Sequence, residues 1–429
     1  MNAPELPQTL TDWLERIEAC HPSEIELGLD RLKAVADRLP INLSTATRVI
    51  VAGTNGKGST LAMLDSILRQ QGVKTGVYTS PHFLRYNERI SVSGQPIDDA
   101  SLIRAFNTIE QAREGVPLTY FEYGTLAALL VFTEQQVDVA LLEVGLGGRL
   151  DAVNIVDADI ALVTTVALDH TDWLGSDREA IGFEKAGIYR AGKPALCGDP
   201  DVPRALIEHA DVLSAPLLCN GRDYRFVVLA DGWEWSGQSA QGMPLQYRHL
   251  PLPVLPVQNA ALVLQALQFL PFVIHEDAIR NGFKHAQLTG RMQSTQLGEL
   301  GVTLDVAHNP EAAAYLASRL EADQSKRPVS LILGMLSDKD IAAVVDHLKP
   351  VVEHWYPVTL DVPRGADADE LSRVLMDAGV PESCISSSAS VATAVAQVVE
   401  EAANSRVVIA GSFFTVADAL ALVSRQGVQ

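Results

Sequence analysis

The stretch from Arg48 to Thr60 reads RVIVAGTNGKGST, and its residue types suit phosphate binding. A β-branched apolar run leads into a glycine-rich turn with one lysine, and a helical pattern follows. Glycines let backbone N–H groups approach an anion, and the N-terminus of the helix adds a positive dipole. Lys57 supplies a positive charge, and Ser59 or Thr60 can place a hydroxyl near a metal ion. These features predict a site for the phosphates of ATP or GTP.

The spacing of this turn departs from the general P-loop pattern G-x-x-x-x-G-K-[ST]. Only Thr54 and Asn55 separate Gly53 from Gly56, and a further glycine follows the lysine. An ordinary glycine-rich turn between a strand and a helix is therefore the alternative. Other parts of the chain favour phosphate binding.

Three side chains that can bind a metal ion stand where predicted strands end. They are Ser80, Glu143 and His170. The carboxyl ends of parallel strands meet at one edge of a sheet, so we expect these side chains to converge beside the phosphate turn. A carboxylate there can hold Mg²⁺, whereas histidine is an unusual ligand because Mg²⁺ prefers oxygen. Taken singly, each residue fits an ordinary loop or turn.

The segment Gly145–Leu150, GLGGRL, lacks the last glycine of a dinucleotide-binding fingerprint. It predicts a tight loop, after which Asp151 and Asn154 can present polar groups to a substrate. Lys185 lies on a predicted helix, where a lysine usually faces solvent. Reaction of its amine with CO₂ would instead create a carboxylate-like metal ligand.

A second group of polar residues follows a strand in the last third of the chain. Asp305, His308 and Asn309 belong to the motif DVAHNP. An aspartate at such a position commonly binds a ribose hydroxyl, while Asn309 before Pro310 equally fits a helix cap. Arg291 lies in a polar stretch, where it either reaches phosphates as two domains close or is simply solvated.

Length and composition narrow the class of protein. The chain has 429 residues, which favours two domains, and its 47% hydrophobic and 20% charged residues are typical of globular proteins. The formal net charge of −20 argues against nucleic-acid binding. The apolar run at 126–132 is too short to cross a membrane, and the N-terminus lacks signal-peptide features. We therefore expect a cytoplasmic protein with neither a nucleic-acid nor a membrane partner.

The order of predicted elements indicates an α/β protein with two domains. The first would hold a doubly wound, mostly parallel sheet with the P-loop-like turn. Its strands are predicted at Val49–Ala52, Thr75–Thr79, Val137–Glu143 and Ile160–Val166. Alternating residues around Asp231–Gly232 predict a small antiparallel patch in the same domain. Helices are predicted at Thr11–Glu18, Asp98–Arg113, Glu122–Gln136, Gln258–Phe269 and Glu276–His285.

A polar linker is predicted at 291–301, and a smaller, Rossmann-like α/β domain at 302–429. The strands of this second domain are expected at Val302–Val306, Val329–Leu333, His354–Val358, Cys384–Ser386 and Val407–Ala410.

Long motifs connect the chain to a known family. They are GTNGKGST at 53–60, TSPHFLRYNERI at 79–90, LTYFEYGTLAA at 118–128, LEVGLGGRLDAVNIV at 142–156, ALDHTDWLG at 167–175, EKAGI at 184–188, DVAHNP at 305–310 and GSFFTVADAL at 411–420. With them the chain resembles, over nearly its whole length, the dihydrofolate synthase/folylpolyglutamate synthase family of the Mur ligase superfamily. The turn at 53–60 is then that superfamily's version of the P-loop.

The resemblance implies an ATP-dependent ligase that works through an acyl phosphate. Its substrates would be L-glutamate with either 7,8-dihydropteroate or a reduced folate. Mg²⁺ would be the metal, with a monovalent cation as a further candidate, and we expect a monomer. The alternatives are a folylpolyglutamate synthase without the dihydropteroate reaction, another Mur-type ligase, for which the segment before the turn is short, and a non-catalytic nucleotide-binding module.

The resemblance also implies roles for individual residues. The implied nucleotide contacts are Asn55, Gly56, Lys57, Gly58, Ser59, Asn259, Arg291 and Asp305. Ser80, Glu143 and His170 are implied to hold Mg²⁺, and Lys185 to be carbamylated. The implied substrate contacts are Glu26, Leu27, Gly28, Thr119, Tyr120, Phe121, Glu122, Leu150, Asp151 and Ala152. The implied catalytic residues are Lys57, His170, Lys185 and His308. Residues 1–290 would then bind ATP and the pterin, and 302–429 would form the glutamate-ligase domain.

Overall fold

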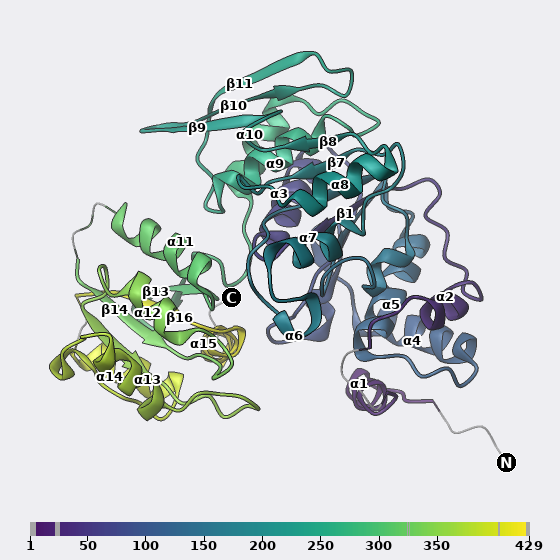
Figure 1. Cartoon of the computed structure of the whole chain (residues 1–429). Coiled ribbons are helices and arrows are strands. Elements are labelled where there is room, and N and C mark those ends of the chain that lie inside the picture. The colour runs from purple at the N-terminus through teal and green to yellow at the C-terminus, as the bar shows by residue number, and fades with distance from the viewer. Residues whose placement is uncertain (1–5, 22–25, 324, 326, 402–403, 426–429) are drawn as a thin grey trace. The chain divides into compact units, whose positions relative to one another are not determined.

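The computed structural model describes the chain except residues 1–5, 22–25, 324, 326, 402–403 and 426–429. The chain forms two compact units, Met1–Ala286 and Gln287–Gln429, each with its own sheet (Figure 1). The predicted α/β architecture, with a large mostly parallel sheet and a smaller C-terminal α/β unit, is confirmed.

The main sheet of the first unit has the strand order β4-β3-β2-β5-β1-β6-β7-β8. Neighbouring strands from β2 to β8 run parallel, and β3 and β4 continue the sheet in antiparallel fashion. The strands are β1 (Thr47–Ala52), β2 (Thr75–Tyr78), β3 (Ile90–Val92), β4 (Gln95–Pro96), β5 (Val139–Glu143), β6 (Ile160–Val163), β7 (Ala195–Cys197) and β8 (Leu217–Cys219).

Helices cover both faces of this sheet. One face carries α1 (Leu10–Glu18), α2 (Asp30–Ala36), α4 (Asp99–Arg113), α5 (Tyr120–Gln135), α7 (Arg178–Ala186) and α8 (Arg204–Leu213). The other carries α3 (Lys57–Gln70), α9 (Val257–Leu267) and α10 (Glu276–His285). A short α6 (Thr171–Leu174) and two 3-10 turns, Tyr86–Arg89 and Ala152–Ile155, complete the unit. No helix among the described residues has the length and apolar character to cross a bilayer.

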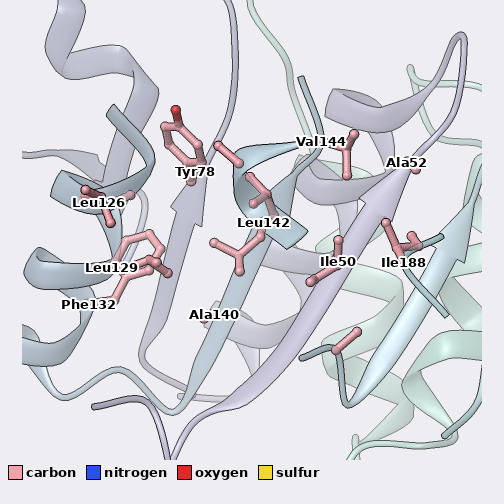
Figure 2. Close-up of a cluster of buried hydrophobic side chains, with 14 of the residues drawn as sticks. Ile50, Ala52, Tyr78, Leu126, Leu129, Phe132, Ala140, Leu142, Val144 and Ile188 are labelled. Atoms are coloured by element: carbon pink, nitrogen blue, oxygen red, sulfur yellow. The ribbon is translucent and has the colours of Figure 1, made fainter. Parts of the chain in front are cut away.

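The central strands are apolar because both faces of the sheet are covered. β5 is buried at every position, and β1 is buried at its last four. Figure 2 shows Ile50 of β1 and Leu142 of β5 in one cluster with Leu129 and Phe132 of α5. This core fixes the strand ends that carry the candidate site.

The predicted helices are confirmed to within two residues at each end. Gly72, just beyond the end of α3, has a φ of +83°. Its N–H donates to Arg69 O at 3.0 Å, and the N–H of Val73 donates to Leu68 O at 3.0 Å. This pair of hydrogen bonds is the Schellman motif, which glycine favours because the φ is positive.

The predicted antiparallel patch is confirmed as a three-stranded sheet of β9 (Arg225–Leu229), β10 (Gly232–Gln238) and β11 (Pro244–Leu250). Trp235 Nε1 donates to Ala261 O of α9 at 3.1 Å, and the Trp233 ring lies 5.4 Å from that of Phe283 in α10. Two buried tryptophans therefore attach the patch to the helices that cover the main sheet.

The second unit has a five-stranded sheet in the order β12-β13-β16-β14-β15. Its strands are β12 (Gln293–Leu297), β13 (Leu300–Asp305), β14 (Val329–Leu333), β15 (His354–Pro357) and β16 (Arg406–Ala410). β12 is antiparallel to β13, and the remaining pairs are parallel. The helices are α11 (Pro310–Glu321), α12 (Ile341–Leu348), α13 (Ala368–Asp377), α14 (Val391–Glu401) and α15 (Phe413–Arg425).

Two expectations for this unit are wrong. Part of the predicted linker is the strand β12, whose sequence QSTQL is polar because alternate residues of this edge strand are exposed. The predicted strand Cys384–Ser386 is also absent, since Cys384 ends a 3-10 turn that begins at Glu382. Only an isolated bridge between Ile385 and Trp355 remains there.

The contact between α10 and α3 gives a prediction about stability. A Cβ atom on Gly282 would lie 2.3 Å from Ile67 Cγ1 and 2.6 Å from Ile67 Cα, so a methyl group there must displace a backbone. Gly282→Ala should lower the free energy of unfolding by about 1–3 kcal/mol in a urea titration. The control is Asn281→Ala, an exposed position on the same helix, which should stay within about 0.5 kcal/mol. Equal effects of the two changes would contradict this account.

Candidate active site

The glycine turn between β1 and α3 is closely packed from two sides. Gly53 has a φ of +149°, and Gly56 caps α3 with a φ of +87°. A Cβ atom on Gly53 would lie 1.8 Å from Thr164 Oγ1, and one on Gly56 would lie 2.6 Å from the Asn259 side chain. Both positions therefore require glycine, and the predicted nucleotide residue Asn259 lies directly against the turn.

Two threonines that follow β6 hold the turn in place. Thr165 accepts from the N–H of Asn55 through Oγ1 at 3.1 Å and from the N–H of Thr54 through its carbonyl at 2.8 Å. Thr164 Oγ1 donates to Asn55 O at 2.5 Å. Neither threonine was predicted to belong to the site, although two threonines directly after a buried apolar strand are a signal that the sequence offers.

Lys57 is the first residue of α3, and its ammonium group bends back over the turn. Nζ donates to Gly53 O at 3.0 Å and to Thr54 O at 3.4 Å. A phosphate would offer this lysine a charged and stronger acceptor than these carbonyls. In the same helix, Ser59 and Thr60 are buried, and Thr60 Oγ1 has no hydrogen-bond partner among the described residues. The residues at the start of α3 are thus of the types that bind a phosphate together with a metal ion.

A small pocket at this edge of the sheet brings together several of the predicted catalytic residues. It is lined by Gly53, Thr54, Lys57, Val144, Gly145, Leu146, Gly147, Asp169, His170, Leu174 and Lys185. His170 caps α6 with a φ of +50°, and its side chain is half exposed. Its Nε2 lies 3.8 Å from a carboxylate oxygen of Asp169, which the sequence analysis did not select.

Lys185 is buried in this pocket rather than exposed as a helical lysine usually is. Burial, and to a smaller extent the nearby charge of Lys57, lowers its pKa to about 7, although Asp169 and Asp151 act in the opposite direction. A lysine with this pKa is largely uncharged at mildly alkaline pH and is then nucleophilic. The site therefore offers the form of the amine that reacts with CO₂.

Ser80 and Glu143 lie together at the carboxyl ends of β2 and β5. The N–H of Ser80 donates to Glu143 Oε2 at 3.3 Å, and Glu143 is 6% exposed. Figure 2 shows Val144, the residue after Glu143, at the same end of the sheet as Ala52. Val144 also lines the pocket that contains His170. Carboxylate and hydroxyl oxygens suit a hard divalent cation.

Ser80, Glu143 and His170 can hold a metal ion only if further oxygen ligands complete its coordination. Within the described part of the chain, no group of three or more His, Cys, Asp or Glu residues is arranged to hold a metal ion. The predicted trio contains only two residues of these types, Glu143 and His170. Hydroxyls, substrate phosphates and water would have to supply the remaining positions, as is usual for Mg²⁺.

The loop after β5 is tight, as the sequence predicted, and it packs on α7. A Cβ atom on Gly148 would lie 2.8 Å from Glu184 O, and the N–H of Arg149 donates to that same oxygen at 2.8 Å. Asn154 Nδ2 donates to Arg149 O at 2.9 Å, so its side chain holds the loop rather than facing a substrate as expected. The glycines thus serve the contact between the loop and the helix of Lys185.

Asp151 is buried beside this loop, and Leu150 is partly exposed. The Asp151 carboxylate accepts from the N–H groups of Leu146 at 2.8 Å and Val153 at 2.9 Å. Burial nevertheless raises the pKa of Asp151 to about 6, although these N–H groups and Lys57 act to lower it. Ala152 begins the following 3-10 turn.

The predicted substrate residues Thr119–Glu122 form the start of α5. Thr119 Oγ1 accepts from the N–H of Glu122 at 3.2 Å, and Glu122 Oε2 accepts from the N–H of Thr119 at 2.7 Å. Arg31 donates to Glu122 Oε1 at 2.7 Å and also pairs with Glu26. Glu122 therefore caps its own helix, and Arg31, which the sequence analysis missed, joins two of the predicted substrate segments.

Aromatic residues flank the same helix start. The Phe121 ring lies 5.8 Å from that of Tyr78, and a Cβ atom on Gly145 would be 2.7 Å from the Phe121 ring. The Tyr120 ring lies 5.4 Å from the Arg89 guanidinium. Leu27 and Gly28, with a φ of +148°, are partly buried in the segment before α2.

In the second unit, Arg291, Asp305 and His308 gather at the end of β13. Asp305 is buried and accepts from the N–H groups of Met292 and Ala307, each at 2.9 Å. Burial raises its pKa, against the effect of Arg291. The Phe413 ring centroid lies 5.4 Å from the Arg291 guanidinium and 6.3 Å from the His308 ring. Phe413 belongs to GSFFTVADAL, but the sequence analysis gave it no role.

Asn309 caps α11 by accepting from the N–H of Ala312 at 3.0 Å, which is the helix-capping alternative left open by the sequence. Pro310 follows as the first residue of the helix.

Comparisons with known proteins agree with this architecture. The Mur ligase middle domain matches residues 51–196, and the Mur ligase glutamate ligase domain matches residues 290–413. The dihydrofolate synthase/folylpolyglutamate synthase of Escherichia coli strain K12 is 45% identical over 421 residues, which are 98% of this chain and 97% of the relative.

Solved structures of such enzymes are also similar. E. coli FolC in complex with DHPP and ADP has a TM-score of 0.91 at 45% identity, covering 99% of this chain and 100% of that one. A bifunctional folylpolyglutamate synthase/dihydrofolate synthase with Mn, AMPPNP and L-glutamate bound has a TM-score of 0.88 at 43% identity, covering 98% and 100%. Similarity of this extent shows that the chain belongs to the dihydrofolate synthase/folylpolyglutamate synthase family.

Proposed function

We propose that the protein is an ATP-dependent ligase that joins L-glutamate to 7,8-dihydropteroate and to the γ-carboxyl group of reduced folates. The observation that carries this proposal is the pocket in which Lys57 and the buried Lys185 meet beside the glycine turn. The relatives named above support it, since one was solved with DHPP and ADP and another with Mn, AMPPNP and L-glutamate.

The chemistry explains why a nucleotide site is needed. A carboxylate does not react with an amine at neutral pH, because its carbon is a poor electrophile and has no leaving group. Transfer of the γ-phosphoryl group of ATP to the carboxylate gives an acyl phosphate. The uncharged amine of L-glutamate then attacks the acyl carbon, an amide bond forms, and phosphate leaves.

The glycine turn and Lys57 serve the phosphoryl transfer. Backbone N–H groups at Gly56, Gly58 and Ser59 would surround the phosphates, since they lie at the turn and the start of α3. Asn55, whose own N–H donates to Thr165, is a further proposed nucleotide contact. The ammonium group of Lys57 would neutralise the charge that develops on the transferred group. In the second unit, Asp305 and Arg291 would contact the nucleotide, and His308 the phosphates or the incoming amino acid.

Ser80, Glu143 and His170 would hold a divalent cation, which we propose to be Mg²⁺. When bound, this ion supplies positive charge to the phosphate oxygens. Lys185 is the residue that we propose to be carbamylated, because its lowered pKa leaves the amine free to react at about neutral pH. A monovalent cation is a further proposed component.

The segments Glu26–Gly28, Thr119–Glu122 and Leu150–Ala152 would bind the pterin. Phe121 offers an aromatic face there, and Asp151, whose pKa of about 6 lies near physiological pH, is a candidate to bind polar ring atoms. Residues 1–290 would thus bind ATP and pterin, and 302–429 would act in glutamate ligation. We further propose that the protein acts in the cytoplasm as a monomer.

Phosphate release from MgATP, measured with L-glutamate and either 7,8-dihydropteroate or a reduced folate monoglutamate, tests the function. We expect release with both acceptors, and glutamylated products in the mass spectrum. Release with the reduced folate alone would indicate a folylpolyglutamate synthase without the dihydropteroate reaction. Release with neither would refute the ligase.

Removal of the lysine in the turn should abolish this turnover. Lys57→Ala is expected to slow phosphate release by at least about 100-fold, because the charge that stabilises the transition state is lost. The far-UV circular dichroism should not change. The matched control is Lys284→Ala, an exposed lysine on α10, which should retain full activity. Full activity of a well-folded Lys57→Ala variant would refute the role of Lys57.

The state of Lys185 should make activity depend on CO₂. The uncharged fraction of its amine rises as the pH rises through about 7. Bicarbonate added to CO₂-depleted protein should therefore restore more activity above about pH 7 than below it. The readouts are the initial rate and the mass of the intact protein. Lys185→Gln should show no bicarbonate effect, and an equal response in the two proteins would exclude carbamylation at this residue.

A further inference from the structure

The backbone N–H and C=O of one residue in the loop after β6, Val166, are held by the same pair of side chains. Arg178 Nε donates to Val166 O at 2.8 Å, and the N–H of Val166 donates to Asp199 Oδ2 at 2.7 Å. Arg178 Nη2 in turn donates to Asp199 Oδ1 at 3.2 Å. The backbone of Val166 is therefore fixed from both sides by an ion pair that belongs to other elements.

This ion pair joins three segments of the first unit. Arg178 is the first residue of α7, Asp199 follows β7 and is buried, and Val166 follows β6. Arg178 Nη2 also donates to Asp201 O at 2.6 Å, and the N–H of Asp201 donates to Asp199 Oδ1 at 2.9 Å. These contacts leave the guanidinium little freedom to move.

The loop that Arg178 and Asp199 hold at Val166 leads directly into the candidate active site. The next residue, Ala167, exchanges two hydrogen bonds with Thr54 Oγ1 of the glycine turn, at 3.0 and 3.1 Å. Asp169 and His170 follow and line the pocket. The last turn of α7, which begins at Arg178, carries Lys185 in the same pocket.

Stability alone does not account for this arrangement. The Asp199 carboxylate is buried, whereas the Arg178 side chain is 35% exposed. Burying a charge costs desolvation, which its pairing often only offsets. Arg178 also has an exposed partner in Asp201, which would suffice for a surface ion pair. What the pair adds is a fixed position for the backbone of Val166, directly before the two hydrogen bonds that join Ala167 to the glycine turn.

We propose that Arg178, through Asp199, is a positioning residue that sets the loop Val166–His170 and the start of α7, and so controls the affinity of the site for its divalent cation. This inference rests on the proposed function, in which His170 binds that cation. Some residues do not bind the metal ion themselves but hold its ligands in position. Replacing such a residue commonly weakens metal affinity by about 10–100-fold.

The test is a titration of the protein with Mn²⁺ in the presence of ADP, in which free Mn²⁺ is measured by electron paramagnetic resonance. Arg178→Gln and Asp199→Asn should each weaken Mn²⁺ binding by about 10–100-fold. Arg178→Lys keeps the charge but not the fork of donors, so an intermediate loss is expected. Binding of ADP in the presence of EDTA should change less than about twofold. Arg204→Gln, an exposed arginine on α8, is the control and should match the unaltered protein.

Each other outcome has a distinct meaning. Unchanged Mn²⁺ affinity in folded Arg178→Gln and Asp199→Asn variants would overturn the positioning role. Equal losses of Mn²⁺ and ADP binding, or failure of all three variants to fold, would make the pair a structural element and would also overturn it. Absence of Mn²⁺ binding by the unaltered protein would refute the proposed metal site itself, which is a separate failure.

Discussion

The close approach of the glycine turn to the end of β6 is the constraint on which the site depends. The parallel register places Ala52 of β1 beside Val163 of β6, so the next residue of each strand, Gly53 and Thr164, must meet at the sheet edge. A side chain at Gly53 would overlap Thr164 Oγ1. Since the turn has no room to move away, its N–H groups are fixed before any ligand arrives, and a site that is already organised stabilises developing charge without rearrangement. The loop that carries His170 is fixed through the same contact.

The electrostatics of the pocket oppose the overall charge of the protein. Against a net charge of −20, Lys57 and Lys185 share one small pocket. Burial and mutual repulsion lower the pKa of Lys185 to about 7, well below that of lysine in an unfolded chain. The resulting cost to folding is greatest below about pH 7, where both states hold the proton, and declines as the pH rises toward the ordinary lysine pKa. Asp151 and Asp169 offset part of this cost. The reactivity of the lysine is thus obtained at some expense of stability.

Much of the fold was predictable because its signals are local. The apolar run of β5, the glycines of the turn and the caps of α3 and α11 each reflect contacts within a few residues. β12 was missed because the exposed edge strand QSTQL carries no apolar pattern. The positions of Thr164, Arg178 and Arg31 depend on partners far along the chain, which spacing cannot reveal. The burial of Lys185 was likewise missed, because a lysine in a helix usually faces solvent, although this one lies four residues after the buried Ile181 on the same helix face.

The contact of Gly56 with Asn259 has a consequence for synthesis of the protein. The turn joins β1, the first strand along the chain, to α3, but the side chain that covers Gly56 lies on α9, nearly half the chain later. α10 follows still later and packs on α3 through Gly282. A chain still emerging from the ribosome therefore carries the glycine turn for most of its translation without the helices that cover it. Nascent chains must reach α10 before the nucleotide site can acquire its mature surroundings, so truncated products would expose the apolar side of α3 rather than act as small nucleotide-binding domains.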